Sequence, residues 1–155
     1  MNEAKALIKE AFAAFQEDVS AIPPMTLRAG NAADNYMESS PFSADEDAIT
    51  EDYLHKYRWG LGYLDTKSWR HYMPHLIEHS INHYVSGSDV TDALLQNLRP
   101  PDRGGFSALN PDQEQVIVKL LDLIAFAEAS PHISAAQTAL EEWWGPAPLY
   151  RPTST

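Results

Sequence analysis

The sequence predicts a single all-α domain of five to seven helices, packed as an orthogonal or irregular bundle. Apolar residues recur at three- and four-residue steps in several segments, which is the spacing of an amphipathic helix. No segment alternates polar and apolar residues as a half-buried strand does. The 155 residues, of which 44% are hydrophobic, suffice for one domain with its own core. We expect this domain to span residues 1–146 and an extended tail to follow over residues 147–155.

The first predicted helix runs over residues 2–20. Asn2 serves as its N-cap, and the pair Pro23 and Pro24 stops it. Residues 22–43 are predicted to form a long loop, because glycine, asparagine, serine and proline interrupt any period there. A loop of this length is uncommon in a compact domain and indicates a functional or mobile segment.

Capping patterns and glycine breaks position the next helices. The pattern Ser43-x-x-Glu46 predicts a second helix that extends to about residue 59. A third helix is predicted from residue 65 or 66 to residue 85, where a Ser-Gly-Ser run ends it. A short fourth helix should follow over residues 89–98.

The clearest helix start in the chain lies at Asn110. A proline follows at the first helical position, and Gln113 completes a box-like cap. Apolar side chains cover most of the circumference of this helix, so we expect it to reach about residue 129 and to be the central buried helix. A further pattern, Ser134-x-x-Gln137, predicts the last helix.

The composition excludes several classes of function. The chain contains no cysteine, so disulfides, thiolate zinc sites and cysteine nucleophiles are excluded, and a reducing, cytoplasmic setting is predicted. The N-terminus lacks the pattern of a signal peptide, and no apolar stretch approaches membrane-spanning length. The net charge of −11 makes nucleic acids and anionic membranes poor partners. No nucleotide-binding motif is present, and no cofactor is predicted.

Most of the surplus negative charge lies in the first third of the chain. Residues 1–52 contain 11 acidic and 3 basic residues, whereas residues 53–155 contain 11 and 8. We therefore predict an acidic protein-binding module that docks a basic partner, as an immunity or inhibitor protein masks a toxin. The alternative is that these charges serve solubility and helix-start electrostatics. The densest acidic patch, and the predicted docking site, consists of Asp45, Glu46, Asp47, Glu51 and Asp52.

Aromatic and arginine residues supply further candidates. Trp69 and Arg70 are predicted to contribute to the partner interface, because tryptophan and arginine are common anchors there. The alternative is core packing, with Arg70 bonding an acid. The segment 99–105 holds two arginines and a glycine pair, so it is either an anion site or a connecting loop. Of Trp143 and Trp144, we expect one ring to pack inward.

A histidine ladder provides the alternative function. His71, His75, His79 and His83 are each four residues apart, which places neighbouring pairs on one helix face. Residues 75–79 match the H-x-x-E-H pattern of inverted zinc peptidases, in which both histidines bind zinc and the glutamate is the general base. The pattern predicts a metal-dependent hydrolase with His75 and His79 as ligands. The competing interpretation is a solvent-exposed helix face without metal.

Two segments carry a resemblance to a known family. The first is the run Tyr63-Leu64-Asp65-Thr66-Lys67-Ser68-Trp69-Arg70-His71-Tyr72-Met73-Pro74, and the second is Phe106-x-x-Leu109-x-x-x-Gln113 followed by an apolar helix. Together they resemble a family of small, uncharacterised bacterial helical proteins, a domain of unknown function, over roughly residues 6–145. The resemblance implies a compact helical domain and assigns no activity or catalytic residues.

Overall fold

Residues 2–103 and 105–152 are described by a computed structural model, and they form helices and loops with no strand among them. The predicted all-α class is confirmed. The α-helices are α1 (Glu3–Ala14), α2 (Gln16–Ser20), α3 (Leu27–Asp34), α4 (Glu51–Lys56), α5 (Thr66–His83), α6 (Asp89–Asn97), α7 (Pro111–Ala125) and α8 (Ile133–Ala139). Two 3-10 helices, η1 (Arg58–Tyr63) and η2 (Phe106–Ala108), and a π-helical turn, η3 (Leu140–Trp144), join them.

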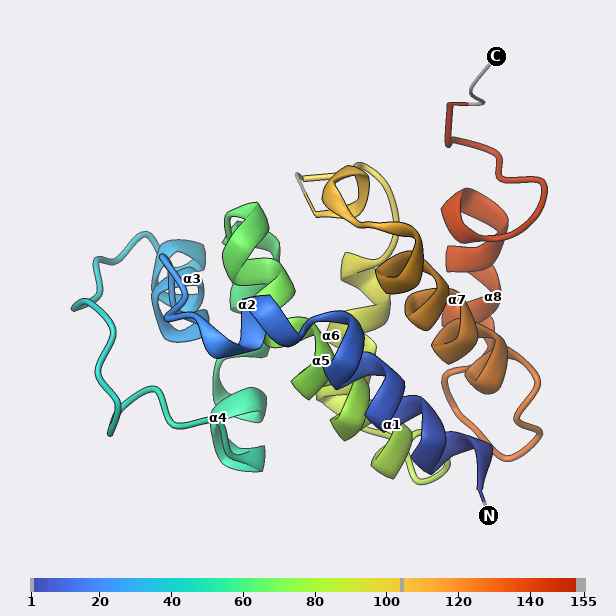
Figure 1. Cartoon of the computed structure of the whole chain (residues 1–155), viewed down its shortest axis with the longest axis horizontal. Helices are drawn as coiled ribbons and strands as arrows, with labels where there is room; N and C mark the ends of the chain where they lie inside the picture. The colour runs from blue at the N-terminus through green and yellow to red at the C-terminus, as the bar shows by residue number, and fades with distance from the viewer. Residues whose placement is uncertain (1, 104, 153–155) are drawn as a thin grey trace.

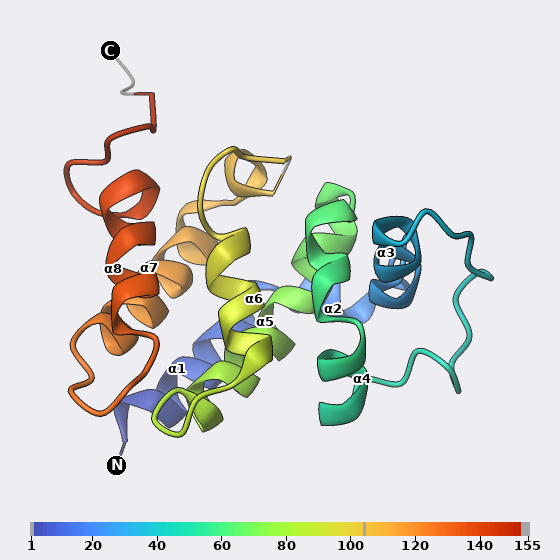
Figure 2. The ribbon, with the colours of Figure 1, turned by 180° about the vertical axis from the view of Figure 1, so that it is seen from behind.

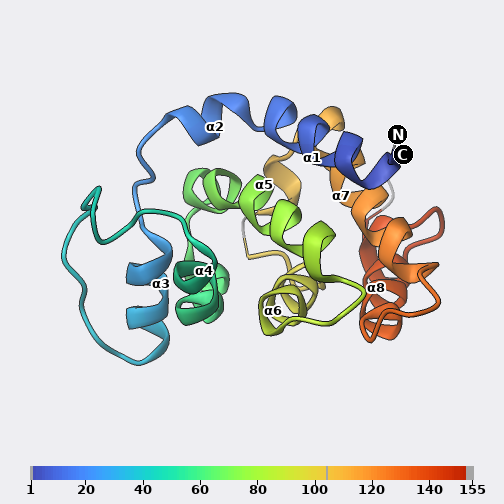
Figure 3. The same ribbon diagram turned by 90° about the horizontal axis from the view of Figure 1, so that it is seen from below.

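The helices pack around α5. Figure 3 shows α1 and α2 in one row above α5, with α3, α4, α6 and α8 on the other side. α5 contacts α1, α2 and α6, while α7 packs against α1 and α8. In Figure 1, α3 lies at one end of the molecule and α7 with α8 at the other. The predicted burial of α7 is confirmed, since Ile117, Leu120 and Leu121 are fully buried, but α7 lies toward one end rather than at the centre (Figure 1).

Buried polar side chains make the sequence of α5 less apolar than that of a typical central helix. Ser68 and Ser80 are fully buried, which lowers the apparent hydrophobicity of the helix. Each is satisfied inside the protein, because Ser80 Oγ accepts from Thr91 Oγ1 at 3.1 Å and Ser68 Oγ accepts from the backbone N–H of Met25 at 2.8 Å. A buried polar group with such a partner costs little, so the helix can be central.

Three predicted helix starts are confirmed. The side chains of Asn2, Asp65 and Asn110 accept backbone hydrogen bonds at the N-termini of α1, α5 and α7. Asn110 and Gln113 form both bonds of a capping box. The predicted first helix is divided at Phe15, a fully buried residue that leaves helical geometry between α1 and α2.

Two predicted helix starts are wrong, although the Ser43 hydroxyl does accept from the N–H of Glu46 at 3.4 Å. Ser43 begins only a single turn, in which the N–H of Asp47 bonds the Ser43 carbonyl oxygen at 2.8 Å. Helix α4 begins later, at Glu51, with Thr50 as its N-cap. The last helix is preceded by His132 rather than by Ser134.

The predicted loop over residues 22–43 contains α3. Thr26 caps this helix by accepting from the N–H of Ala29 at 3.0 Å. Gly30 lies within α3 and permits backbone contact with η1, since a Cβ there would lie 2.3 Å from the carbonyl oxygen of Gly60. Gly30 is therefore a packing residue rather than a helix breaker, and the irregular segment shortens to residues 35–50.

The predicted tail folds back on the preceding turn. The N–H groups of Leu149 and Tyr150 bond the carbonyl oxygens of Glu141 and Glu142, at 2.9 and 3.0 Å. Residues 153–155 of the predicted tail lie outside the described residues. In the described part of the chain, no helix combines the length and apolarity needed to cross a membrane.

Candidate functional site

Residues 35–50, which we name the strap, join α3 to α4 at one end of the molecule (Figure 2). The strap is tied down by Arg28 of α3. Arg28 Nη1 donates to the hydroxyl oxygens of Ser39 and Ser40, at 2.8 and 2.9 Å, and Nη2 donates to the carbonyl oxygen of Pro41 at 3.2 Å. One guanidinium group therefore fixes the middle of an irregular segment.

Asp47 anchors the other half of the strap. Its side chain accepts from Arg28 Nη2 at 2.8 Å, from the Tyr53 hydroxyl at 2.7 Å and from the N–H of Ser43 at 2.9 Å. Burial raises the pKa of Asp47, but these hydrogen bonds outweigh it and hold the pKa below its ordinary value. Asp47 is only 4% exposed, so its predicted role in contacting a partner is wrong.

The rest of the predicted acidic patch is divided between two surroundings. Asp45, Glu46 and Asp52 are exposed, although Glu46 also lies 3.4 Å from Arg28 Nη2. Glu51 turns toward α5, where its carboxylate bonds His79. Of the five predicted carboxylates, only Asp47 is therefore buried, and Glu51 is 63% exposed although it bonds His79.

The strap also exposes large apolar side chains, namely Tyr36, Met37 and Phe42. Tyr36 is 99% exposed and has a positive φ of 58°. Its N–H bonds the carbonyl oxygen of Ala33, and the next N–H, of Met37, bonds that of Ala32, which is the Schellman ending of a helix. Glycine is the usual residue at this left-handed position, because a Cβ is disfavoured there. A fully exposed tyrosine thus occupies a position where it costs stability.

Trp69 lies in the core and Arg70 bonds an acid, which is the arrangement expected as the alternative to a partner interface. Trp69 is buried and packs edge-on against Phe106, with ring centroids 6.2 Å apart. Arg70 Nε donates to Asp18 Oδ1 at 3.1 Å. The inward packing of one C-terminal indole is confirmed, since Trp144 is buried and bonds a backbone carbonyl oxygen.

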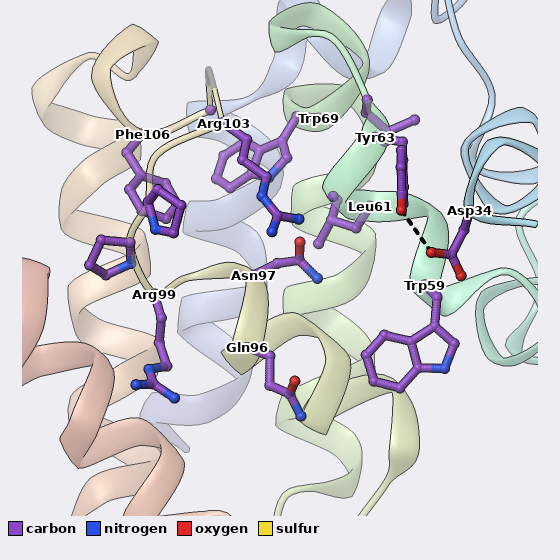
Figure 4. A pocket seen from close by; sticks show the side chains of 15 residues that line it. Asp34, Trp59, Leu61, Tyr63, Trp69, Gln96, Asn97, Arg99, Arg103 and Phe106 are labelled. Carbon is purple, nitrogen blue, oxygen red and sulfur yellow. Dashed lines mark hydrogen bonds between the residues drawn. The ribbon is translucent and has the colours of Figure 1, made fainter.

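A pocket of about 250 Å³ opens between η1, the end of α6 and the loop at residues 99–105. Figure 4 shows the guanidinium of Arg103 directed into it, near Asn97. Exposed Trp59 and Tyr63 form one wall, and the Tyr63 hydroxyl donates to Asp34 Oδ1 at 2.9 Å, which raises the pKa of Tyr63. The loop therefore lines a cavity and does more than connect helices.

The histidine ladder of α5 splits into two pairs with different neighbours. The first pair, His71 and His75, faces the N-terminal helices. The His75 ring lies edge-on to Phe12 with centroids 5.0 Å apart, and His71 Nδ1 bonds the carbonyl oxygen of Asp18 at 2.9 Å. Burial lowers the pKa of His75 to about 4, and the charge of His71 adds to this effect.

The second pair lies beside Glu51. His79 Nδ1 donates to the Glu51 carboxylate, and His83 Nε2 lies 3.7 Å from the same oxygen. On the opposite edge of the ring, His79 Nε2 accepts from the Ser88 hydroxyl at 2.6 Å. His79 is only 6% exposed. The structure brings His79 together with Glu51 and His83, rather than with the predicted co-ligand His75.

Sequence reasoning missed Arg28, although a signal was present. Arg28 is the only lysine or arginine between Lys9 and Lys56, within the most acidic part of the chain. A single cation among many carboxylates is a natural partner for one of them. The sequence also offers no reason to group Glu51 with His83. Their proximity depends on how α4 packs beside the end of α5, which no local pattern predicts.

Comparisons with known proteins agree with the resemblance seen in the sequence. No curated protein and no solved structure matches the chain. The model of a family of unknown function, DUF6714, matches residues 1–147. The chain therefore belongs to this family of unknown function.

Proposed function

We propose that the chain is a protein-binding module whose strap end docks a basic protein, as an inhibitor or immunity protein masks its target in the cytoplasm. The observation that carries this proposal is the Arg28–Asp47 ion pair. This ion pair fastens the strap to α3, while the strap exposes both apolar and acidic side chains. Such an arrangement favours binding, because a preordered surface loses little conformational entropy when a partner docks.

The exposed apolar side chains supply the contact area. Tyrosine and methionine are enriched at protein interfaces, and both occur next to each other in the strap as Tyr36 and Met37. Trp59 and Tyr63 extend the aromatic surface toward the pocket that Arg103 lines. A partner side chain that enters this pocket would pack against this aromatic wall.

Electrostatics support a basic partner. The exposed carboxylates of Asp45, Glu46 and Asp52 lie in or directly after the strap, and the chain carries a net charge of −11. Opposite charge on the partner accelerates encounter and aligns the two surfaces, and salt weakens both effects. The proposal therefore requires that affinity fall as ionic strength rises.

Affinity capture from cells of the source organism, with three forms of the purified chain as bait, tests the proposal. The forms are the natural chain, a strap variant, and a control variant that loses the same number of charges at the opposite end of the molecule, near α7 and α8. The strap variant carries Asp45→Asn, Glu46→Gln and Asp52→Asn, and the control carries Asp122→Asn, Glu128→Gln and Glu141→Gln.

We expect the natural chain and the control to retain the same basic protein and the strap variant to lose it. The retained protein is then purified, and its affinity is measured against salt concentration. Equal retention by the strap variant contradicts the proposed surface. Equal loss from both variants shows an effect of net charge alone and also contradicts it.

A further inference from the structure

We propose that Glu51, His79 and His83 form a binding site for one Zn²⁺ ion, with one coordination position left open to water. The site lies between the N-terminal end of α4 and the C-terminal end of α5. It is independent of the partner surface, so its test does not depend on the proposed function.

The donor atoms are suited to zinc in kind and in number. Two imidazoles and one carboxylate are a common set for zinc sites that keep an open position. Each of the three residues offers one donor atom, and these atoms lie within 4.8 Å of one another. In a tetrahedral site with bonds of about 2.0–2.1 Å, donor atoms lie about 3.3 Å apart. The observed 3.7 Å between His83 Nε2 and Glu51 Oε2 is close to that separation.

Neighbouring residues fix the orientation of the buried ligand, His79, whereas the side chains of Glu51 and His83 are free to move. His79 Nδ1 faces the Glu51 carboxylate, so an ion replaces the proton that they share. The other ring nitrogen of His79 lies 2.6 Å from the Ser88 hydroxyl, and this contact fixes the orientation of the imidazole ring. Glu51 and His83 have 63% and 41% exposed side chains, which lets both move by the small amount that coordination requires.

The contacts of Glu51, His79 and Ser88 also follow the order of a serine hydrolase triad. The Ser88 hydroxyl, however, caps α6 by accepting from the N–H groups of Val90 and Thr91 at 3.1 and 3.4 Å. A hydroxyl that holds the start of a helix is a poor nucleophile, because its lone pairs are already engaged. The geometry therefore favours a metal ligand set over a nucleophile.

Isothermal titration of the untagged, chelator-stripped chain with Zn²⁺ tests the site. The informative variants are Glu51→Gln and His83→Gln, because these exposed positions leave the core intact. The matched control is His71→Gln, which removes a histidine from the other i, i+4 pair of the same helix. Circular dichroism of each variant checks that its helical content is unchanged.

We expect one Zn²⁺ per chain for the natural protein and for His71→Gln, and affinity at least about tenfold weaker for Glu51→Gln and His83→Gln. Addition of Zn²⁺ should also shift the imidazole ¹⁵N resonances of His79 and His83 and leave those of His71 and His75 in place. Substoichiometric binding, or equal affinity in all four proteins, overturns the proposal. Loss of binding in His71→Gln alone overturns it in favour of the first histidine pair.

Discussion

Replacement of Asp47 by alanine tests how the strap is held. The substitution removes a buried carboxylate that accepts hydrogen bonds from Arg28, Tyr53 and the backbone of Ser43. Arg28 then keeps its hydroxyl and carbonyl contacts and its contact with the exposed Glu46, but it loses its buried counter-charge. The strap should separate from α3 while the helical core stays folded.

The expected cost follows from burial. Removing one partner of a buried ion pair costs about 3–5 kcal/mol, because the remaining charge is left without compensation. The Arg28 side chain is 13% exposed and lies 3.4 Å from Glu46, so water and that carboxylate offset part of the cost. We expect a loss of about 3 kcal/mol, which lowers Tm by roughly 6–12 °C in a domain of this size.

Urea denaturation and amide hydrogen exchange measure this effect. The matched control is Asp45→Ala, an exposed strap carboxylate whose loss should change stability by less than about 0.5 kcal/mol. The pKa of Asp47 lies below its ordinary value of 3.8. The contribution of Asp47 is therefore complete above about pH 4 and is lost as pH falls through the folded pKa. If Asp47→Ala and Asp45→Ala cost the same at neutral pH, the ion pair does not hold the strap.

Three further substitutions test other parts of the structure. Tyr36→Gly should raise the free energy of unfolding by about 1 kcal/mol, measured by urea denaturation, because glycine accepts the positive φ; a loss of stability contradicts the assignment of strain. His75 has a pKa of about 4 in the folded chain and an ordinary value of 6.5, so protonation favours unfolding between these values. The natural chain should lose up to about 3 kcal/mol from pH 7 to pH 4 relative to His75→Gln, and parallel pH profiles contradict this. Gly60→Ala places a Cβ 2.3 Å from a backbone oxygen of α3 and should cost more than about 2 kcal/mol in chemical denaturation. In the control Gly62→Ala, the new Cβ approaches only the movable ends of the Arg103 and Asn97 side chains, so the loss of stability should be smaller. Equal losses for the two variants would exclude a tight backbone contact at Gly60.

The sequence predicts structure well where all the interacting residues lie within one short segment. Asn2, Asp65 and Asn110 cap helices through hydrogen bonds to residues two or three positions away, so the pattern is local and was recognised. The same rule predicted a helix at Ser43 that did not form. Arg28, 19 residues from Asp47, draws that carboxylate into a buried ion pair, and a local pattern contains no information on such a partner.

Contacts between distant segments account for the remaining differences. Gly30 and Gly60 permit the approach of α3 to η1, and each appears in the sequence only as a residue that disfavours helix. The polar face of α5 was predicted to meet solvent. Phe12 of α1 packs against His75, and the carbonyl oxygen of Asp18 bonds His71, so two residues that look exposed in a helical projection are partly buried.

Site-specific photo-crosslinking in cells of the source organism tests the proposed docking surface most directly. A photoreactive phenylalanine derivative replaces Tyr36 in the strap or, as the control, Tyr150, a second exposed tyrosine in the C-terminal segment. We predict a covalent adduct with one basic protein from position 36 and none from position 150. An absence of adducts at position 36, or the same adducts from both positions, contradicts a docking surface at the strap.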